Sequence, residues 1–365
     1  MEIAIVGLAG SGKSTVFNTL TRGHAETGGY GGMTVNVGVV KVPDQRLTTL
    51  TALFKPKREV PADVTYVDLP APPPTEGATA NDLPADALAR LRNADALLHV
   101  VRAFDDPAVP HPSGSVDAWR DLEQLDLELT LADLGVAEKR LEKLQTSGRH
   151  GTPAEREANE REAAVLERIV PGLTAGRPIR DLDLDEDAAK AVRGFRFLTE
   201  KPVLVLVNVG EGDLAVVEAR VATIRDRYDH RQSMVDALSA RIEMEIGELD
   251  DESAIVFREE LGLTESSLDR VIRLSYRLLG LISFFTAGPD ETRAWTIHDG
   301  ETSVDAAAAI HSDLARGFIR AEVVACEDLL ELGSMAEARR HGRLRSEGKT
   351  YRVKDGDVVE ILFNV

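Results

Sequence analysis

The sequence is poor in cysteine and has few positive charges relative to its negative ones. Its one cysteine, Cys326, excludes an internal disulfide and a zinc site built from several thiolates, which fits a reducing compartment. Lysine and arginine number 43 against 62 aspartate and glutamate residues, which gives a net charge of -19. Proteins that coat nucleic acids or membrane surfaces depend on cationic surface, so the composition argues against both classes.

Long hydrophobic runs are also absent. The longest apolar stretches, VLVLVNV and LLGLISFF, have the length of a strand or a core segment and fall well short of a membrane span. A glycine-rich turn begins at Gly7, too soon after Met1 for the apolar segment of a secretory signal. With 43% hydrophobic and 29% charged residues, the 365-residue chain is expected to be a cytoplasmic globular protein of two or three domains.

Short apolar runs alternate with amphipathic segments in the first part of the chain. This pattern is typical of strand–helix–strand units around a largely parallel sheet, and it predicts an α/β fold. Strands are expected over residues 1–7, 35–43, 64–70, 94–104 and 201–211, and a helix over 12–22. The nearly continuous apolar character of 94–104 indicates a strand that is covered on both faces.

Between the last two of these strands the sequence is helical in character and strongly charged. Residues 121–145 and 153–170 carry leucine and alanine at helical spacing among Glu, Lys and Arg. We interpret the segment as a helical hairpin inserted into the sheet domain. A disordered spacer is the alternative, and the persistent leucine period argues against it. Residues 171–187 are expected to form the return loop of the hairpin.

The C-terminal part differs again in its pattern. A helix is expected over residues 269–288, and from about residue 281 the chain mixes short strands (293–302 and 349–365) with a helix (304–317). Asp-Gly pairs mark the turns, so we predict a small α+β module. The expected division is therefore 1–117 and 197–280 for the sheet domain, 118–196 for the insertion and 281–365 for the module.

The stretch GLAGSGKST matches the phosphate-binding pattern G-x-x-x-x-G-K-[ST]. Gly7, Gly12, Lys13 and Ser14 occupy its fixed positions, between an expected strand and an expected helix. In such a P-loop, backbone N–H groups and the helix dipole surround the β-phosphate, while the lysine bridges the β- and γ-phosphates and the hydroxyl binds Mg²⁺. A glycine turn with an unrelated lysine is the alternative. The placement of the motif favours a nucleoside triphosphate site.

Asp68 ends the expected strand at 64–70 and should therefore lie beside the P-loop. An acid in that place can hold Mg²⁺ through a water molecule. A surface aspartate at a strand end is the alternative.

The base specificity depends on the end of the strand at 201–211. Guanine readers carry Asn/Thr-Lys-x-Asp there, whereas this chain has Asn208-Val209-Gly210-Glu211. The lysine is absent and the acid is one methylene longer, so the motif does not suit tight reading of guanine and permits adenine. GTP binding and an arbitrary loop both remain open at this point.

Several long runs, in order, resemble the YchF or Obg-like ATPase family. They include GLAGSGKST, NVGVVKVPDQRL, NADALLHVVRAFDD, KPVLVLVNVGE and FFTAGPDETRAWTIHDGET, and together they cover nearly the whole chain. The resemblance implies a P-loop G domain with a helical insertion and a C-terminal TGS-type, ubiquitin-like module. It also implies ATP preference through N-x-x-E, a Mg²⁺ cofactor, and an association with ribosomes and with translation or stress regulation.

The resemblance also implies roles for individual residues. The phosphates are held by Gly10, Ser11, Gly12, Lys13, Ser14 and Thr15. Between Asn208 and Glu211, Val209 contacts the adenine through its main chain, and Ser239 and Ala240 form the base-side loop. Ser14, Thr34 and Asp68 are the expected Mg²⁺ ligands, and Lys13 and Asp68 the expected catalytic residues.

The second switch of the family has Asp-x-Ala-Gly and a mobile glycine-rich loop, and this chain differs from it. Asp68 is present, but Ala71 replaces the glycine among Pro70, Pro72, Pro73 and Pro74. Proline has no N–H to donate to a γ-phosphate, and the run favours a stiff extended conformation. We therefore expect slow hydrolysis. A nucleotide-sensing adaptor with little turnover is the alternative.

A cationic segment lies near the C-terminus of this acidic chain. Residues 339–354 contain Arg339, Arg340, Arg343, Arg345, Lys349, Arg352 and Lys354, with one acid among them before Asp355. The segment is a candidate for contact with RNA phosphates, on the ribosome or elsewhere. A solvated helix and hairpin face is the alternative. His99, Trp295 and Cys326 are expected in the core, and His311 within a helix.

Overall fold

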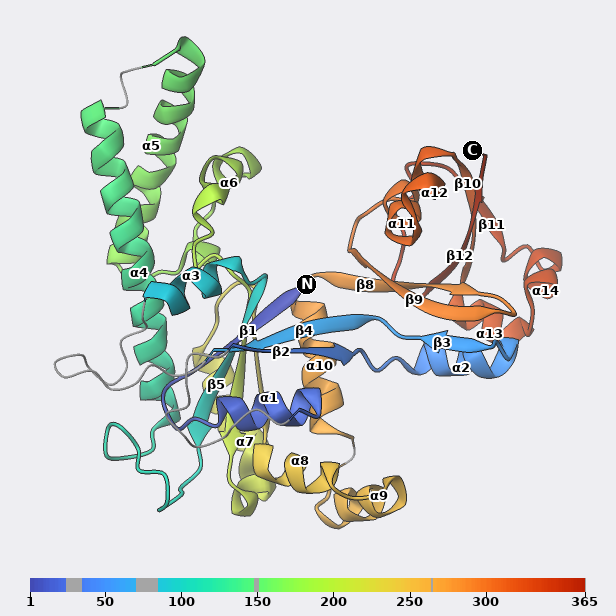
Figure 1. The fold of residues 1–365 in the computed structure, drawn as a ribbon, viewed down its shortest axis with the longest axis horizontal. Helices are drawn as coiled ribbons and strands as arrows, with labels where there is room; N and C mark the ends of the chain where they lie inside the picture. Colours follow the sequence, from blue (N-terminus) through green and yellow to red (C-terminus); the bar gives the residue numbers. More distant parts are fainter. Residues whose placement is uncertain (24–34, 70–84, 148–150, 264, 365) are drawn as a thin grey trace. The chain divides into compact units, whose positions relative to one another are not determined.

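The computed structural model describes residues 1–23, 35–69, 85–147, 151–263 and 265–364 (Figure 1). The chain forms two compact units, one of Met1–Gly38 and Thr65–Val271 and the other of Val39–Val64 and Ile272–Val365. It therefore leaves the first unit for residues 39–64, returns, and leaves it finally at residue 272. The four-part division expected from the sequence stays a proposal, and it did not anticipate this excursion.

The first unit is built on a six-stranded sheet. Its order is β2 (Asn36–Lys41), β4 (Asp63–Asp68), β1 (Glu2–Val6), β5 (Ala96–Ala103), β6 (Val203–Val209) and β7 (Ser233–Leu238). The strands from β4 to β7 pair in parallel. β5 and β6 are buried along nearly their whole length, which agrees with their continuous apolar sequences.

Helices follow the strands of this sheet and fix where the loops lie. They are α1 (Lys13–Thr21), α3 (Ala85–Asn93), α7 (Val217–Arg227), α8 (Ala240–Gly247), α9 (Asp251–Glu260) and α10 (Ser267–Leu278), with a 3-10 turn at Glu211–Val216. The carboxyl ends of parallel strands meet at one edge of a sheet, which is where α/β proteins bind ligands. The P-loop, Asp68, Asn208 and the end of β7 all belong to that edge.

The insertion is a helical hairpin with its own apolar core. It contains α4 (Ala118–Ser147), α5 (Pro153–Thr174), α6 (Glu186–Val192) and 3-10 turns at Ile179–Asp181 and Arg193–Phe195. Leu166, Ile169 and Phe197 are fully buried in this core. The expected return loop is partly wrong, because α5 continues through Pro171 to Thr174 and α6 follows. No helix in the described part of the chain is long and apolar enough to cross a bilayer.

The second unit is an α+β module on a mixed sheet. Its strands run in the order β11 (Arg345–Glu347), β10 (Phe318–Ala325), β12 (Asp357–Phe363), β8 (Leu281–Ala287), β9 (Glu291–His298) and β3 (Arg58–Val60). Its helices are α2 (Gln45–Phe54), α11 (Ser303–Ile310), α12 (Ser312–Arg316), α13 (Cys326–Leu332) and α14 (Met335–Arg340). β3 pairs in parallel with β9, so the excursion of the chain supplies an edge strand to the C-terminal sheet.

Two expected helices in this region are wrong in part. The helix expected over 269–288 ends at Leu278, and after Gly280, whose φ is +66°, the chain continues as β8. β-branched and aromatic side chains favour the strand here. The helix expected over 304–317 is interrupted at His311, whose backbone is extended and whose Nδ1 accepts a hydrogen bond from Asp313 N at 3.1 Å.

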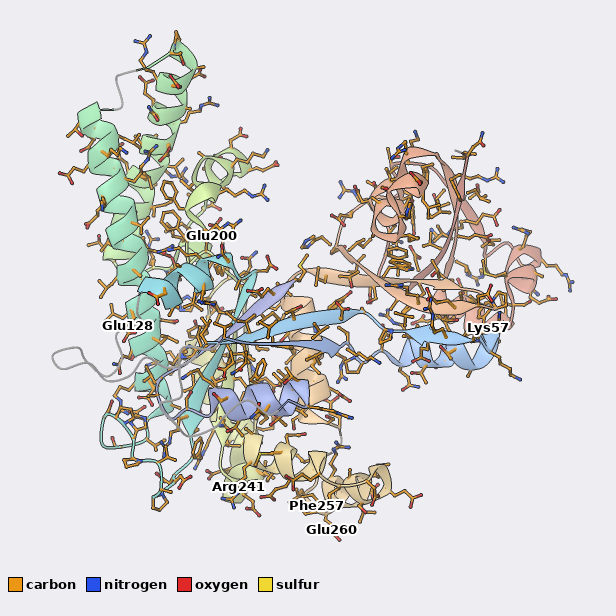
Figure 2. All side chains as sticks on the ribbon, in the orientation of Figure 1. Lys57, Glu128, Glu200, Arg241, Phe257 and Glu260 are labelled. Carbon is orange, nitrogen blue, oxygen red and sulfur yellow. The ribbon has the colours of Figure 1, made fainter. Side chains whose placement is uncertain are left out.

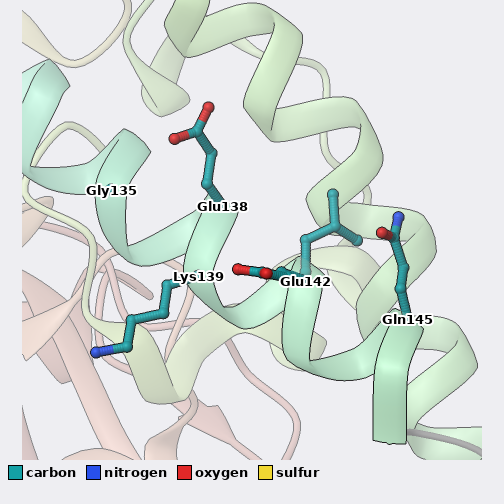
Figure 3. Close-up of a pocket in the computed structure, with 6 residues that line it drawn as sticks. Gly135, Glu138, Lys139, Glu142 and Gln145 are labelled. Carbon is teal, nitrogen blue, oxygen red and sulfur yellow. The ribbon is translucent and has the colours of Figure 1, made fainter.

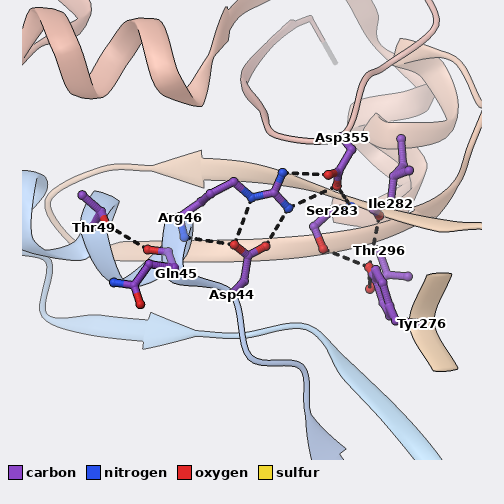
Figure 4. A network of polar contacts seen from close by, with 9 residues as sticks. All are labelled: Asp44, Gln45, Arg46, Thr49, Tyr276, Ile282, Ser283, Thr296 and Asp355. Carbon is purple, nitrogen blue, oxygen red and sulfur yellow. Dashed lines mark hydrogen bonds and ion pairs between the residues drawn. The ribbon is translucent and has the colours of Figure 1, made fainter. Parts of the chain in front are cut away.

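Within the second unit, a polar cluster links the start of α2 to the C-terminal part of the chain (Figure 4). The Arg46 guanidinium binds Asp44 at 2.8 Å and Asp355 at 2.7 Å, and it lies over the Phe285 ring. The Asp355 carboxylate also accepts from Ser283 N at 2.9 Å. One arginine from residues 39–64 therefore binds the loop before β12, and through Asp355 it is linked to β8.

Candidate functional site

The P-loop connects β1 to α1 and has the backbone that its glycines permit. Gly10 and Gly12 have φ of +73° and +92°, and Gly12 is the N-cap of α1. A Cβ at Gly12 would lie 2.3 Å from Asn208 Nδ2, so only glycine fits this position. Ser11 N donates to Leu8 O at 3.3 Å, while Ser14 and Thr15 lie in the first turn of α1.

Lys13 is turned inward onto the loop itself. Its ammonium donates to Gly7 O at 2.8 Å and to Leu8 O at 2.9 Å. Burial lowers its pKa to about 8, and the negative charge of Asp68 opposes that change. The lysine is thus a partly buried cation held against the loop carbonyls, where an anion would stabilise it.

Asp68 lies beside the P-loop, as the sequence predicted. Its Oδ2 accepts a 2.9 Å hydrogen bond from the Ser14 hydroxyl, and the residue is buried. Burial raises the pKa of Asp68, while Ser14, Lys13 and Asn36 act in the opposite direction. Oδ1 makes no hydrogen bond of normal geometry within the described residues. A hydroxyl and a carboxylate oxygen at this spacing suit a hard cation such as Mg²⁺, which takes few protein ligands and completes its shell with water and phosphate.

Asn208 joins the P-loop to the loop that the sequence predicts beside the base. Its Nδ2 donates to Ser11 O at 3.0 Å, and its Oδ1 accepts from Ala240 N at 3.1 Å. Ser239, the N-cap of α8, is buried next to Ala240. The structure therefore brings together the predicted phosphate and base segments through one side-chain amide.

The other residues predicted to contact the base make no side-chain bond to the P-loop among the described residues. Val209 is the buried last residue of β6, and Glu211 is exposed at the start of the 3-10 turn that follows. Thr34 and the segment Pro70–Pro74 lie outside the described residues.

Comparisons with known proteins agree along the whole chain. A family model described as "50S ribosome-binding GTPase" matches residues 2–144, and the model YchF-GTPase_C, described as "Protein of unknown function (DUF933)", matches residues 281–364. "Ribosome-binding ATPase YchF" of Bacillus subtilis is 42% identical over 370 residues, which cover all of both chains. The chain belongs to the YchF family.

Further YchF relatives agree with this assignment. "Ribosome-binding ATPase YchF" of Pasteurella multocida is 40% identical over 367 residues, covering all of this chain and 99% of the relative. The "Structure of the Schizosaccharomyces pombe YchF GTPase" superposes with a TM-score of 0.85 at 32% identity and covers 99% of this chain and 97% of that one. The resemblance inferred from the sequence and the α/β fold with a P-loop domain are thus confirmed.

In this YchF chain, Arg102 and Phe104 adjoin the P-loop, and sequence reasoning missed them. Arg102 is 3% exposed; its Nη1 reaches Gly10 O at 3.5 Å, and its guanidinium lies 4.6 Å from the centre of the Phe104 ring. The Phe104 ring lies within 4.0 Å of the position that a Cβ on Gly12 would take. A charged residue near the end of an otherwise largely apolar strand was the available signal.

A buried His–Asp pair also adjoins the loop. His111 Nε2 lies 2.7 Å from Asp121 Oδ2, and His111 Nδ1 accepts from Ser113 N at 3.1 Å. His111 and Asp121 lie around a narrow gap, too small for a water molecule, together with Leu8, Ala9, Ser11, His99 and Arg102. Both ring nitrogens of His111 are engaged, so in this conformation neither is free to bind a water. His99 is buried as expected, and burial lowers its pKa to about 3.

A second pocket lies along α4, away from these residues in the sequence (Figure 3). Gly135, Glu138, Lys139, Leu141, Glu142 and Gln145 line it. It is a shallow surface depression with charged walls and contains none of the predicted nucleotide-binding residues. It is therefore not a candidate for the nucleotide.

The cationic segment 339–354 is largely paired with acids. Arg339 binds Glu322, Arg340 binds Glu337, and Arg343 lies 3.7 Å from Asp328. Arg345 donates to Tyr351 OH at 3.0 Å and lies 3.5 Å from Asp357. These pairs reduce the net positive field that the sequence alone suggested.

Proposed function

We propose that this YchF-family chain is a Mg²⁺-dependent ATPase that associates with the ribosome. The observation that carries the proposal is the pair of bonds made by Asn208, because they link a P-loop to the loop expected beside the base. The names of the bacterial relatives, ribosome-binding ATPases at 40% to 42% identity over the full length, support it.

In this proposal Gly10 to Thr15 surround the phosphates, and Lys13 leaves the Gly7 and Leu8 carbonyls to pair with phosphate oxygens. Ser14 and Asp68 hold Mg²⁺, together with Thr34 from outside the described residues. The ion, when bound, neutralises the phosphate charge. Val209 and Glu211, with Ser239 and Ala240, contact the base. Calorimetry with Mg²⁺ and ADP or ATP tests the site: binding that Lys13→Ala abolishes is expected, and no heat with either purine nucleotide would refute it.

GTP is the second candidate substrate. The solved relative from Schizosaccharomyces pombe is titled a GTPase, whereas the motif from Asn208 to Glu211 lacks the lysine and the aspartate of guanine readers. Competition of ATP and GTP for the same site decides between them. We expect ATP to bind more tightly, and preferential binding of GTP would reverse the assignment.

Hydrolysis is proposed to be slow because of the proline-rich segment after Asp68. Single-turnover phosphate release at saturating ATP measures it, with Ala71→Gly as the comparison. We expect the substitution to raise the rate. A rate already equal to that of relatives with glycine at this position, and unchanged by the substitution, would contradict the proposal. Binding without measurable release would instead favour the nucleotide-sensing adaptor.

We propose that contact with ribosomal RNA involves the exposed cations of residues 339–354. Because Arg345 is bound to Tyr351 and Asp357, its reversal would disturb the fold, so Arg343→Glu and Lys349→Glu are the better probes. Each should weaken co-sedimentation with ribosomes, and the reversal Arg316→Glu at another exposed cation of the same unit serves as the control. Equal binding by all three variants and the unmodified protein would remove this segment from the interface.

A further inference from the structure

The base-side loop, Ser239–Ala240, is held on both sides by the same helix, α10. The residues before the loop bind Arg270 of α10, and the helix after the loop, α8, binds the first residue of α10 through Glu243. Arg241, labelled in Figure 2, lies on the same turn of α8 as Glu243. Neither Glu243 nor Arg270 belongs to a nucleotide-binding motif.

On the first side, Arg270 binds the end of β7 with two hydrogen bonds. Its Nε donates to Asp236 Oδ2 at 2.8 Å and its Nη2 donates to Ala237 O at 2.9 Å. Asp236 is largely buried and Arg270 is partly buried, so water screens this charge-assisted pair less than it screens a surface ion pair. The planar guanidinium thereby fixes the Asp236 side chain and the Ala237 main chain, three and two residues before Ser239.

On the second side, Glu243 binds the N-terminus of α10. Its Oε1 accepts from Ser267 N at 3.1 Å, and the residue is 1% exposed. A carboxylate at a helix N-terminus satisfies a free backbone N–H and interacts favourably with the helix dipole. The cost of burying a carboxylate is high, and Oε2 finds no hydrogen-bond partner within the described residues. A buried carboxylate such as that of Glu243 is therefore expected where it holds a neighbouring element in place.

The loop held in this way makes the contact on which the site depends. Ala240 is the first residue of α8, and its N–H donates to Asn208 Oδ1, whose amide group donates in turn to Ser11 O of the P-loop. A shift of α8 or of the end of β7 would lengthen the Ala240–Asn208 bond. We propose that Glu243 and Arg270 are positioning residues that hold the base-side loop against Asn208 and thereby set nucleotide affinity. The inference rests on the proposed nucleotide site.

The experiment compares Mg²⁺–ADP binding by calorimetry in the full chain and four variants. Arg270→Met and Glu243→Ala each remove one attachment and should raise Kd about five- to tenfold, the size expected from the net contribution of one typical hydrogen bond. Glu243→Gln keeps an oxygen that can accept from Ser267 N and should bind ADP nearly as well as the unmodified protein. Arg277→Met removes an exposed cation from the same helix and is the matched control.

Hydrogen exchange separates positioning from a general loss of structure. In Arg270→Met and Glu243→Ala, a peptide that contains the Ala240 amide should exchange faster, while the peptide that covers α1 and the kcat at saturating ATP stay unchanged. Unchanged Kd and unchanged exchange in variants with native circular dichroism would overturn the inference. If the unmodified protein binds no purine nucleotide, the proposed function itself fails. If Glu243→Ala does not fold, Arg270→Met and Glu243→Gln still decide the question.

Discussion

Asn208 Nδ2 donates to the carbonyl oxygen of Ser11 at 3.0 Å, across 197 positions of the sequence. The same side chain accepts from Ala240 N, so one buried amide binds both the P-loop and the loop predicted to lie beside the base. An amide can do this because it carries a donor and an acceptor on one rigid group. Neither a carboxylate nor an aliphatic side chain could make both bonds.

Substitution of Asn208 should therefore weaken nucleotide binding more than the loss of one small side chain would suggest. Asn208→Ala leaves Ser11 O and Ala240 N without partners in a buried site, and each unsatisfied group costs about 1–3 kcal/mol. We expect the Kd for Mg²⁺–ADP to rise at least tenfold, as measured by calorimetry. Asn208→Asp retains an acceptor for Ala240 N but loses the donor, and should also bind poorly. Wild-type affinity in the aspartate variant would contradict a role for the Ser11 bond.

Gly12 offers a test of the close approach between the P-loop and Asn208. A Cβ there would lie 2.3 Å from Asn208 Nδ2, and φ is +92°, so Gly12→Ala must displace the loop or the amide. We expect Gly12→Ala to show no nucleotide binding in a calorimetric titration under conditions in which the unmodified protein binds.

Gly176→Ala is the matched control for this substitution. Gly176 has φ of +73°, but no atom lies within 4 Å of the added Cβ. The variant is therefore destabilised only by the left-handed backbone, which costs about 1 kcal/mol, and nucleotide binding should be unaffected. Equal loss of binding in both variants would show that backbone strain, and not the contact with Asn208, is responsible.

The sequence predicted the parts of this site that depend on local order. The P-loop is one continuous segment, and Asp68 ends a strand, so both could be placed from pattern and period. Asn208 and Ala240 could be named through the family resemblance, but their bond could not. The sequence could not show the contact of Arg102 with Gly10 or that of Arg270 with Asp236, because the partners lie 92 and 34 positions apart. β3 was missed because three residues carry no period. Strand pairing with β9 is decided by the surrounding sheet, not by Arg58–Val60 alone.

The pH dependence of nucleotide binding should report the charge of Lys13. Burial lowers the pKa of this lysine to about 8 in the free protein, and a bound phosphate raises it again. Binding therefore takes up a proton above that pH. The Kd should be nearly constant below pH 7 and should rise by up to about tenfold per pH unit above pH 8. Titrations between pH 6.5 and 9.5 measure the slope.

Proton uptake provides the control for this pH effect. Binding enthalpies measured near pH 8 in buffers of different ionisation enthalpy should differ by the uptake of a fraction of one proton. In Lys13→Arg the guanidinium stays charged throughout the range, so both the slope and the uptake should vanish. A slope that persists in the arginine variant would assign the titration to another group.

The last prediction concerns Arg46 and Asp355, which link α2 to the C-terminal part of the second unit. Arg46→Met removes the bonds to Asp44 and Asp355. The Arg46 side chain is 33% exposed and Asp355 51%, so water screens part of the loss, and we expect about 1–2 kcal/mol of destabilisation. In a Trp119→Phe background, Trp295 is the remaining tryptophan and its fluorescence follows unfolding of the second unit. Lys57→Met is the control, because Lys57 and its partner Asp290 are 82% and 81% exposed and such pairs contribute little. Equal midpoints for Arg46→Met and Lys57→Met would mean that the polar cluster adds no stability.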